Sequence, residues 1–413
     1  MPRHRLTAEQ VIRHLKHFQG YEIQSSRLLG GWMPGIARWE TKHEIGHHLW
    51  QDAEHSRDLR TRLWELRVTN PDRGLEQVLA STALGLAGAQ EDYEFLAGLY
   101  WVLKTELAAA YQAVVSGTSE VYDGPTIAVI KRILPEKMAQ LEWAKRQIGA
   151  MLDTGEKQRR ATRWIDFCRT LLRKAGGVAG DVPEPSAPEP VPPPGYMLRL
   201  PFPQAIRDDR FKMVLKGMDL PPPDDREAKR LFQFFNYSQE MQAAETLGSL
   251  LWETEGMEWD FYFDLARHCY DEVRHSSMGE ARLRELGHHV TDFPNFSANY
   301  AWRQLVDPLR RYCVLTYVIE ADGFKYKHET YQDHLKNQDL ESAEAVLFDI
   351  MDETMHVRFG QKWVPRLMER YHYEKPLEQL ISECREILMA NSVSPLQKLV
   401  SQSLSRPTQP SPA

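Results

Sequence analysis

The sequence predicts an all-α protein, with two helical bundles joined by a proline-rich linker. In both halves apolar residues recur at intervals of three and four, the period of a helix that buries one face. The alternation of apolar and polar residues that is typical of strands is nearly absent. Between the halves lies AGGVAGDVPEPSAPEPVPPPG, residues 175–195. Because each proline removes a backbone donor and favours extended chain, we expect this stretch to be a linker.

In the N-terminal half, Thr7 and Gln10 have the spacing of a capping box and predict the start of a helix that ends at Gly20. The apolar periodicity then predicts four further helical runs, and we expect them to form one domain over residues 1–174. The four runs cover 37–68, 75–116, 125–152 and 157–174.

The C-terminal half opens with a second proline cluster, DLPPPDD at 219–225. We therefore assign 175–227 to the linker and its connection, and 228–390 to the second bundle. The remaining residues, 391–413, end in SRPTQPSPA and are expected to be a disordered tail. The helical runs of the second bundle cover 228–254, 258–287, 298–337 and 341–371.

Composition excludes some classes of function. The chain has 413 residues and a formal net charge of -7, which gives no basic field for a nucleic-acid backbone. No signal peptide and no run of membrane-spanning length is evident, so a cytoplasmic location is expected. The four cysteines are far apart and form no metal-binding pair, which favours reduced packing thiols.

One motif occurs twice at helical positions, as DEVRH at 271–275 and DETMH at 352–356. Three residues advance a helix by about one turn, so each glutamate shares a face with its histidine, and both faces are apolar. Glu-x-x-His alone is weak evidence, because it recurs in this chain. The other copies are Glu40/His43, Glu44/His47, Glu285/His288 and Glu369/His372.

Two single glutamates distinguish these copies from the others. Glu245 and Glu320 lie on apolar helix stripes, and each precedes one Glu-x-x-His motif. Four carboxylates inside a bundle would lose hydration and repel one another, so they need protons or cations. Two divalent metal ions would neutralise them, and oxygen donors with two imidazoles suit iron or manganese. The candidate metal and catalytic residues are Glu245, Glu272, His275, Glu320, Glu353 and His356.

This pattern resembles the ferritin-like di-iron carboxylate superfamily, whose bundles use one Glu on two helices and Glu-x-x-His on two others. The strings DEVRH and DETMH are also similar to motifs of acyl carrier protein desaturases. The resemblance covers about 230–370. It implies that Glu272 and Glu353 bridge two metals and that Glu245 and Glu320 are terminal ligands. The alternative is a set of helix-face acids paired with arginines.

Three further residues are candidates for a supporting role. Metal-bound imidazoles usually donate their second N–H to an acid or carbonyl, so Asp271 and Asp352 could each orient a histidine, across the pseudo-twofold axis. They could equally be solvated acids beside the ligand face. Tyr317 could line the pocket or carry an electron, or simply fill the core.

The N-terminal half resembles the C-terminal half in one segment. DAEHSRDLRTRLWEL at 52–66 matches EVRHSSMGEARLREL at 272–286, which places Asp52 opposite Glu272 and His55 opposite His275. Continuing the comparison, Glu106 falls near Glu320, with a possible slip of two residues, and Glu136 near Glu353. Ser25 and Ala139 replace two ligands. We interpret this half as a degenerate ferritin-like duplicate. It could still hold one metal through those acids and His55, or through HEIGHH at 43–48, or merely present polar helix faces.

The predicted function is a di-iron oxidase or oxygenase, with two Fe ions, or Mn or mixed Fe/Mn, acting with dioxygen on a small organic molecule. The sequence has no cysteine motif for a built-in electron donor, so an external electron donor is expected as a partner. An oligomer is possible. Nucleic acid and membrane partners are not expected. One alternative is a ferroxidase or peroxide-detoxifying protein, which would handle iron or act like a manganese catalase. A second is a non-catalytic helical scaffold. A third is an enzyme of transfer RNA modification, which the net charge disfavours.

Overall fold

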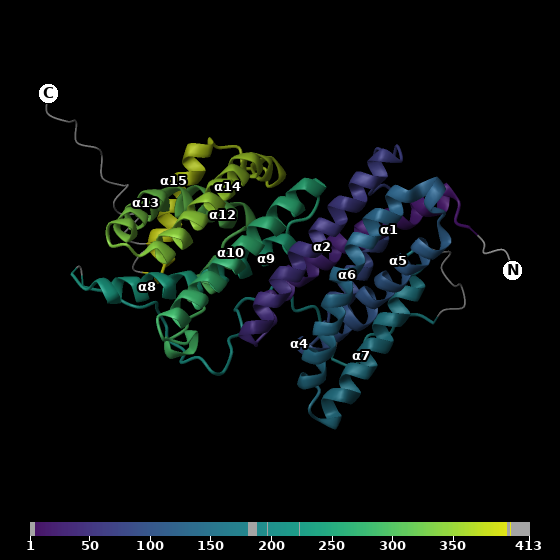
Figure 1. The fold of residues 1–413 in the computed structure, drawn as a ribbon, viewed down its shortest axis with the longest axis horizontal. Helices are drawn as coiled ribbons and strands as arrows, with labels where there is room; N and C mark the ends of the chain where they lie inside the picture. Colours follow the sequence, from purple (N-terminus) through teal and green to yellow (C-terminus); the bar gives the residue numbers. More distant parts are fainter. Residues whose placement is uncertain (1–4, 181–187, 196, 223, 395–396, 398–413) are drawn as a thin grey trace. The chain divides into compact units, whose positions relative to one another are not determined.

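The computed structural model describes residues 5–180, 188–195, 197–222, 224–394 and 397, and within them the all-α prediction is confirmed (Figure 1). The extended pairing in this part of the chain is one isolated bridge, between Met213 and Asn295. Two predictions fall partly outside the described residues: the middle of the proline-rich linker, 181–187, and most of the tail expected at 391–413.

The chain divides into two compact units. Unit 1 comprises residues 1–32 and 47–201, and unit 2 comprises 33–46 and 202–413. Residues 33–46 were expected in the N-terminal domain but pack with unit 2. There Trp39 N–H donates to Asp208 (3.1 Å) and Lys42 Nζ donates to Glu245 (2.5 Å). One long helix, α2 (Trp39–Glu65), therefore begins in unit 2 and continues in unit 1.

The helical runs predicted for the N-terminal half are present, but the run 75–116 is interrupted between Ala87 and Asp92, and the others change at their ends. The expected stop at Gly20 is wrong, because the first helix continues to Trp32. Gly20 instead allows close packing, since a Cβ there would lie 2.5 Å from Leu79 Cδ1. The capping box at its start is present: Thr7 N–H donates to Gln10 (2.8 Å) and Gln10 N–H to Thr7 (3.2 Å). Besides α2, the helices are α1 (Ala8–Trp32), α3 (Glu76–Ala87), α4 (Asp92–Leu96), the π-helix η2 (Ala97–Lys104), α5 (Thr105–Gly117), α6 (Glu120–Met151) and α7 (Gly155–Lys174).

Unit 2 follows the predicted runs, but two of them are broken. The run 228–254 divides at Gln239–Glu240, and the run 298–337 divides between Arg303 and Pro308. Side chains cap several starts, including Asp307, which accepts from Arg310 N–H just before Pro308 at the first helical position. The elements are η1 (Met33–Gly35), α8 (Arg226–Ser238), α9 (Met241–Glu253), α10 (Trp259–Glu285), η3 (Val290–Asp292), α11 (Ala298–Arg303), α12 (Pro308–Cys313), the π-helix η4 (Val314–Glu320), α13 (Ala321–Lys336), α14 (Leu340–Arg370) and α15 (Leu377–Asn391).

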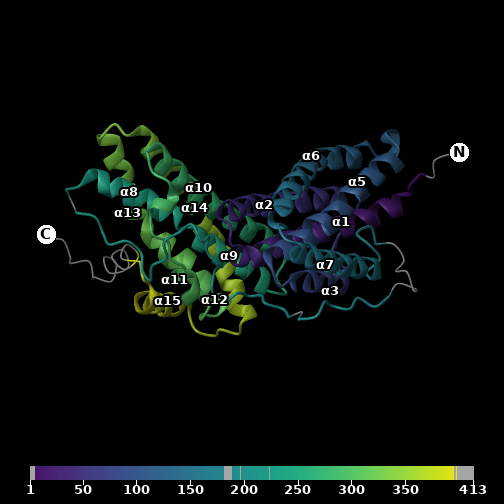
Figure 2. The same ribbon diagram turned by 90° about the horizontal axis from the view of Figure 1, so that it is seen from below.

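The core of unit 2 lies around α10, which contacts α8, α9 and α14, while α14 also contacts α12, η4 and α13 (Figures 1 and 2). Phe261 of α10 meets Trp363 of α14 edge to face, with ring centroids 5.4 Å apart, and both side chains are buried. Burying one such side chain contributes about 1.5–3 kcal/mol. None of the helices in the described part of the chain has the length and apolar composition needed to cross a membrane.

Candidate metal centre

Two long helices of unit 2 present acids and histidines in the same pattern. On α10 the residues are His268, Glu272 and His275, at i, i+4 and i+7. On α14 Asp349, Glu353 and His356 repeat these intervals with an acid first. Such intervals keep three side chains on one helix face, and all six residues are buried.

Two more acids come from places where the α-helical geometry changes. Glu320 is the last residue of the π-helix η4, and Glu240 lies at the break between α8 and α9, at the N-cap position of α9 but without a side-chain capping hydrogen bond. A π-helical turn shifts the direction of later side chains relative to a regular helix, and such turns are frequent at functional sites.

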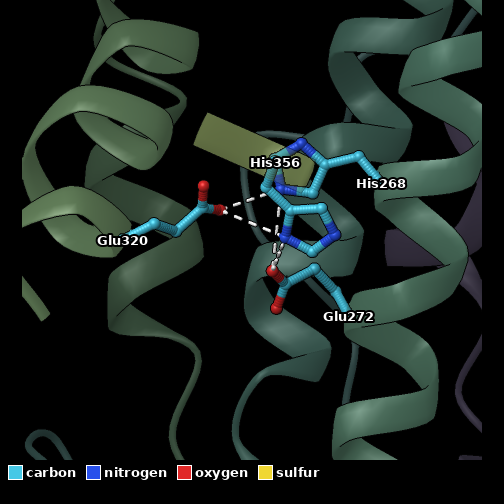
Figure 3. Close-up of side chains that lie close together, drawn as sticks. All are labelled: His268, Glu272, Glu320 and His356. Atoms are coloured by element: carbon cyan, nitrogen blue, oxygen red, sulfur yellow. Dashed lines mark hydrogen bonds and ion pairs between the residues drawn. The ribbon is translucent and has the colours of Figure 1, made fainter. Parts of the chain in front are cut away.

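The tightest group combines two imidazoles and two carboxylates (Figure 3). His268 Nε2 lies 2.8 Å from Glu320 Oε1 and 3.7 Å from Glu272 Oε1. His356 Nδ1 lies 3.7 Å from Glu272 Oε1 and 3.8 Å from Glu320 Oε1. The two imidazole rings stack with centroids 3.8 Å apart. One ion at about 2.0–2.2 Å from each ligand atom fits this spacing.

Two adjoining groups share ligands with the first. Glu272 also belongs to a group with Glu240 and His275, in which His275 Nδ1 lies 3.1 Å from Glu240 Oε2 and 4.0 Å from Glu272 Oε2. Glu240 belongs in turn to a group with Asp349 and Glu353. Glu272 therefore lies where a carboxylate bridging two ions would lie.

A lysine occupies the far side of this cluster. Lys327 Nζ lies 2.7 Å from Asp349 Oδ2 and also contacts Glu353 Oε1. Tyr237 donates from its hydroxyl to Asp349 (2.7 Å). Glu353 was expected to bridge two metals, but in this structure an ammonium neutralises part of its charge.

The pKa values of the cluster show how poorly it tolerates its own charge. Burial raises the pKa of Glu240 to about 7 and raises that of Glu353 well above its usual range. Although burial opposes a charge on His268, the carboxylates of Glu320 and Glu272 raise its pKa to about 9. Glu240 and Glu353 therefore tend to take up protons unless another cation enters.

Several buried ligand atoms also have no hydrogen-bond partner among the described residues. This condition fits a metal site, because a bound ion would satisfy these atoms together. They are Nδ1 of His275 and His356, and Oε2 of Glu240, Glu320 and Glu353.

Asp271 and Asp352 lie crosswise behind the two predicted histidines. His356 Nε2 is 3.3 Å from Asp271 Oδ2, and His275 Nε2 is 3.2 Å from Asp352 Oδ2. Arg274 donates to both acids, at 2.7 and 3.0 Å. Each histidine is therefore held through one nitrogen while Nδ1 faces the cluster, the arrangement that orients a metal ligand.

Two sequence-predicted site residues are not part of the cluster. Glu245 is fully buried but pairs with Lys42 (2.5 Å) and with Arg207 (2.7 Å). Glu240 lies at the N-cap position of α9, and Glu245 lies five residues later in the same helix. Five residues correspond to about 140° around a helix, so the two acids face different sides. Tyr317 is half-buried in η4 and is not among the residues that meet there.

Sequence reasoning missed Glu240, His268, Asp349 and Lys327. A signal for His268 and Asp349 was present, because each lies four residues before a motif glutamate on the same face. No local signal marks Glu240 or Lys327, whose positions depend on a helix break and on packing.

Unit 1 holds a buried polar cluster of a different kind. Lys137 Nζ lies 2.7 Å from Glu22 and 2.8 Å from Asp52, and Lys104 Nζ lies 2.6 Å from Asp52. All four side chains are fully buried. Although burial opposes it, the two lysines hold the pKa of Asp52 well below its usual range. His55 completes a group that could hold an ion with Glu22 and Asp52, but the lysines already neutralise these acids.

The other expectations for unit 1 are changed by this arrangement. Glu106 stays outside the cluster, half-buried beside a separate cavity, and Glu136 is half-exposed and bonds to His55 (3.0 Å). Ser25 donates to Asp52 (2.6 Å). The histidines of HEIGHH have separate partners: His43 lies 3.1 Å from Ser276 Oγ, and His48 lies 2.7 Å from the Tyr100 hydroxyl.

Comparison with known proteins adds a family match without a function. Residues 223–399, less than half of the chain and all within unit 2, match the family described as "Protein of unknown function (DUF455)". Neither a curated protein nor a solved structure matches the chain. The matched segment contains every member of the carboxylate and histidine cluster of unit 2.

Proposed function

We propose that unit 2 binds two divalent metal ions, with iron as the leading candidate, and oxidises a small organic molecule with dioxygen. The single observation that carries this is the group of His268, Glu272, Glu320 and His356, whose ligand atoms all lie within 4.8 Å of one another. Glu272 extends this group towards Glu240 and His275, where a second ion would bind. Ferrous ions held by carboxylates and imidazoles supply electrons and open coordination positions for dioxygen.

The charges of the cluster support two ions rather than one. Five carboxylates meet there with one ammonium, that of Lys327. Two divalent cations together with Lys327 would balance the five negative charges. The acids are Glu240, Glu272, Glu320, Asp349 and Glu353.

The protein residues around the centre have distinct tasks in this proposal. Asp271 and Asp352 orient the histidines, and Arg274 holds both acids in place. Lys327 holds Glu353 and Asp349 on the far side. The four cysteines are buried, and none belongs to a group of ligands, so electrons would come from an external donor.

A cavity beside the cluster favours an organic substrate over the iron-handling and peroxide-detoxifying alternatives. It has a volume of about 160 Å³, and Glu240, Glu272, Glu320 and Glu353 form part of its wall. A cavity of about this size is known to admit benzene. Apolar side chains, among them Leu315, line it as well.

We also propose that the two units are ferritin-like bundles derived from one duplicated ancestor. The spacing of His48, Asp52 and His55 equals that of His268, Glu272 and His275. The π-helices η2 and η4 end at Lys104 and Glu320. In unit 1 Gln140 donates to Gln51 (2.9 Å), and the corresponding pair of unit 2 is His356 with Asp271. Likewise, His55 pairs with Glu136 in unit 1, and His275 pairs with Asp352 in unit 2.

Elemental analysis tests the metal proposal directly. Protein expressed with iron and manganese should contain two ions per chain, and Glu272→Ala should lose most of both because it removes the shared ligand. Glu369→Ala is the matched control, since Glu369 belongs to an exposed Glu-x-x-His copy and should leave the content unchanged. Metal-free wild-type protein, or equal content in Glu272→Ala, would contradict the proposal.

The oxidase activity needs its own measurement. Adding ferrous iron and then oxygen should change the optical spectrum and consume oxygen in the wild type, but not in Glu272→Ala. Oxygen release from hydrogen peroxide, without oxygen consumption, would instead indicate the catalase-like alternative.

A further inference from the structure

Arg303, the last residue of α11, lies in the wall of the cavity beside the metal ligands and is only 3% exposed. Its Nε is buried and has no hydrogen-bond partner among the described residues. Burial lowers the pKa of Arg303 to about 10, although the carboxylates of Glu272 and Glu320 act on it in the opposite direction. The guanidinium carbon lies over the ring of Trp302, 5.5 Å from its centroid. Glu272 and Glu320 act on the guanidinium without a direct ion pair, and both are ligands in the proposed metal centre. A buried guanidinium without an anion in direct contact is costly, so Arg303 is placed to bind one from a ligand.

Gln242 adds a second donor in the same wall. Its side chain is 2% exposed, and Oε1 accepts from the backbone N–H of Asn299 (3.1 Å) and of Tyr300 (3.3 Å). These two bonds fix the orientation of the amide, because Nε2 in that place would meet two donors. Nε2 is therefore directed away from α11, and it is buried without a partner.

The rest of the wall indicates the remainder of the ligand. Apolar side chains cover much of the cavity, and the metal-ligand acids line another part. A ligand that satisfies both donors must carry an acceptor group at one end and an apolar body. The apolar residues are Phe296, Leu315, Val318, Ile319, Val346 and Leu388.

We infer that the substrate of unit 2 is a small carboxylic acid whose carboxylate binds Arg303 and Gln242 while its carbon body fills the apolar part of the cavity. The inference rests on the proposed function, because it takes this cavity as the substrate chamber of the metal centre. A planar carboxylate matches the planar donor fork of arginine. Once two divalent ions and Lys327 have neutralised the five acids, Arg303 remains as the surplus positive charge, which one carboxylate balances.

Calorimetric titration of the full chain tests this inference, with hexanoate, hexanamide and inorganic phosphate as probes. Each is titrated into metal-free protein and into Mn(II)-loaded protein whose metal content is measured in the same samples. Hexanoate should bind at least tenfold more tightly than hexanamide, and more tightly than phosphate. Its affinity should rise with manganese, because the ions neutralise the neighbouring carboxylates.

Variants assign the effect to the two donors. Arg303→Met should weaken hexanoate at least tenfold and leave hexanamide almost unchanged. Gln242→Glu keeps the acceptor that holds α11 but removes the donor and adds a like charge, so it should also weaken hexanoate by tenfold or more. Arg284→Met, an exposed arginine of α10, controls for the loss of one positive charge.

Three results would overturn the inference: hexanamide binding as tightly as hexanoate, phosphate binding more tightly than hexanoate, or hexanoate binding that ignores both Arg303→Met and Gln242→Glu. The last result would mean that the carboxylate ligates the metal directly. Failure of the proposed function looks different. In that case the samples hold no manganese, while any hexanoate binding still depends on Arg303.

Discussion

The buried clusters of the two units place side chains at matching positions but neutralise their acids in different ways. In unit 1 Lys104 and Lys137 lie against Asp52, and each lysine donates at 2.8 Å or less. Under the proposed duplication, with the π-helices η2 and η4 aligned at their ends, Lys104 and Lys137 correspond to Glu320 and Glu353, in place of the Glu106 and Glu136 expected from the sequence. Unit 1 thus carries its cations as side chains, whereas in the cluster of unit 2 five carboxylates meet one lysine, Lys327, which is why we propose that metal ions bind there.

The arrangement of buried polar side chains in such a cluster can stay the same while the groups that neutralise its acids differ. Under the proposed duplication, the pair of Gln51 and Gln140 in unit 1 corresponds to the pair of Asp271 and His356 in unit 2. If unit 2 holds metal as proposed, a lysine in place of an acid would keep the interior neutral without an ion.

The largest expected effect tests the lysines of unit 1. Lys137→Met leaves Glu22 and Asp52 buried beside one remaining lysine, and should lower the free energy of unfolding by about 3–5 kcal/mol. Denaturant unfolding measures it. Lys157→Met is the control, because Lys157 forms an exposed pair with Asp153 that is worth less than about 1 kcal/mol. Equal losses in both variants would show that Lys137 does not replace a cation.

Metal removal should affect unit 2 alone. At a free metal concentration of a hundred times Kd, binding stabilises the folded state by about 2.7 kcal/mol, which a chelator removes. Hydrogen exchange of the full chain should speed up in α10 and α14 after chelation and stay unchanged in α6. Equal loss of protection in α6 would contradict the assignment of the metal to unit 2.

The acids behind the histidines should matter for metal only in unit 2. Asp271→Asn leaves the packing intact but weakens the hold on His356, and should lower metal affinity by about 10- to 100-fold. The matched change is Gln51→Leu in unit 1, where metal affinity should not move. Competition with a chromophoric chelator measures both. Wild-type affinity in Asp271→Asn would mean that Asp271 only balances charge.

The smallest effect concerns pH. The pKa of His268 is about 9 in the metal-free protein, so at neutral pH the imidazole is protonated and an ion must displace that proton. Affinity for the first ion should therefore fall about tenfold for each pH unit below 9. Competition titrations at pH 7 and pH 8 check the slope. An affinity that is equal at both values would show that His268 is not a ligand.

Much of the fold could be predicted from the sequence, because periodicity is a local property. The long runs that became α2, α10 and α14 were located to within a few residues. Errors arose where local signals are weak, as at Gly20, which continues a helix because Leu79 packs over it. Of the six predicted site residues, five meet at the cluster of unit 2 and Glu245 does not.

The sequence by itself determined which helix faces carry acids and histidines, since i, i+3 and i+4 spacing fixes what shares a face. Only the tertiary structure decided which face meets which. Glu245 lies against Lys42 and Arg207, Lys327 lies against Glu353, and the Nε of Arg303 is buried without a hydrogen-bond partner among the described residues. Those outcomes depend on residues that are far apart in the chain. Their charges interact strongly only after folding has brought them together in an interior of low dielectric constant.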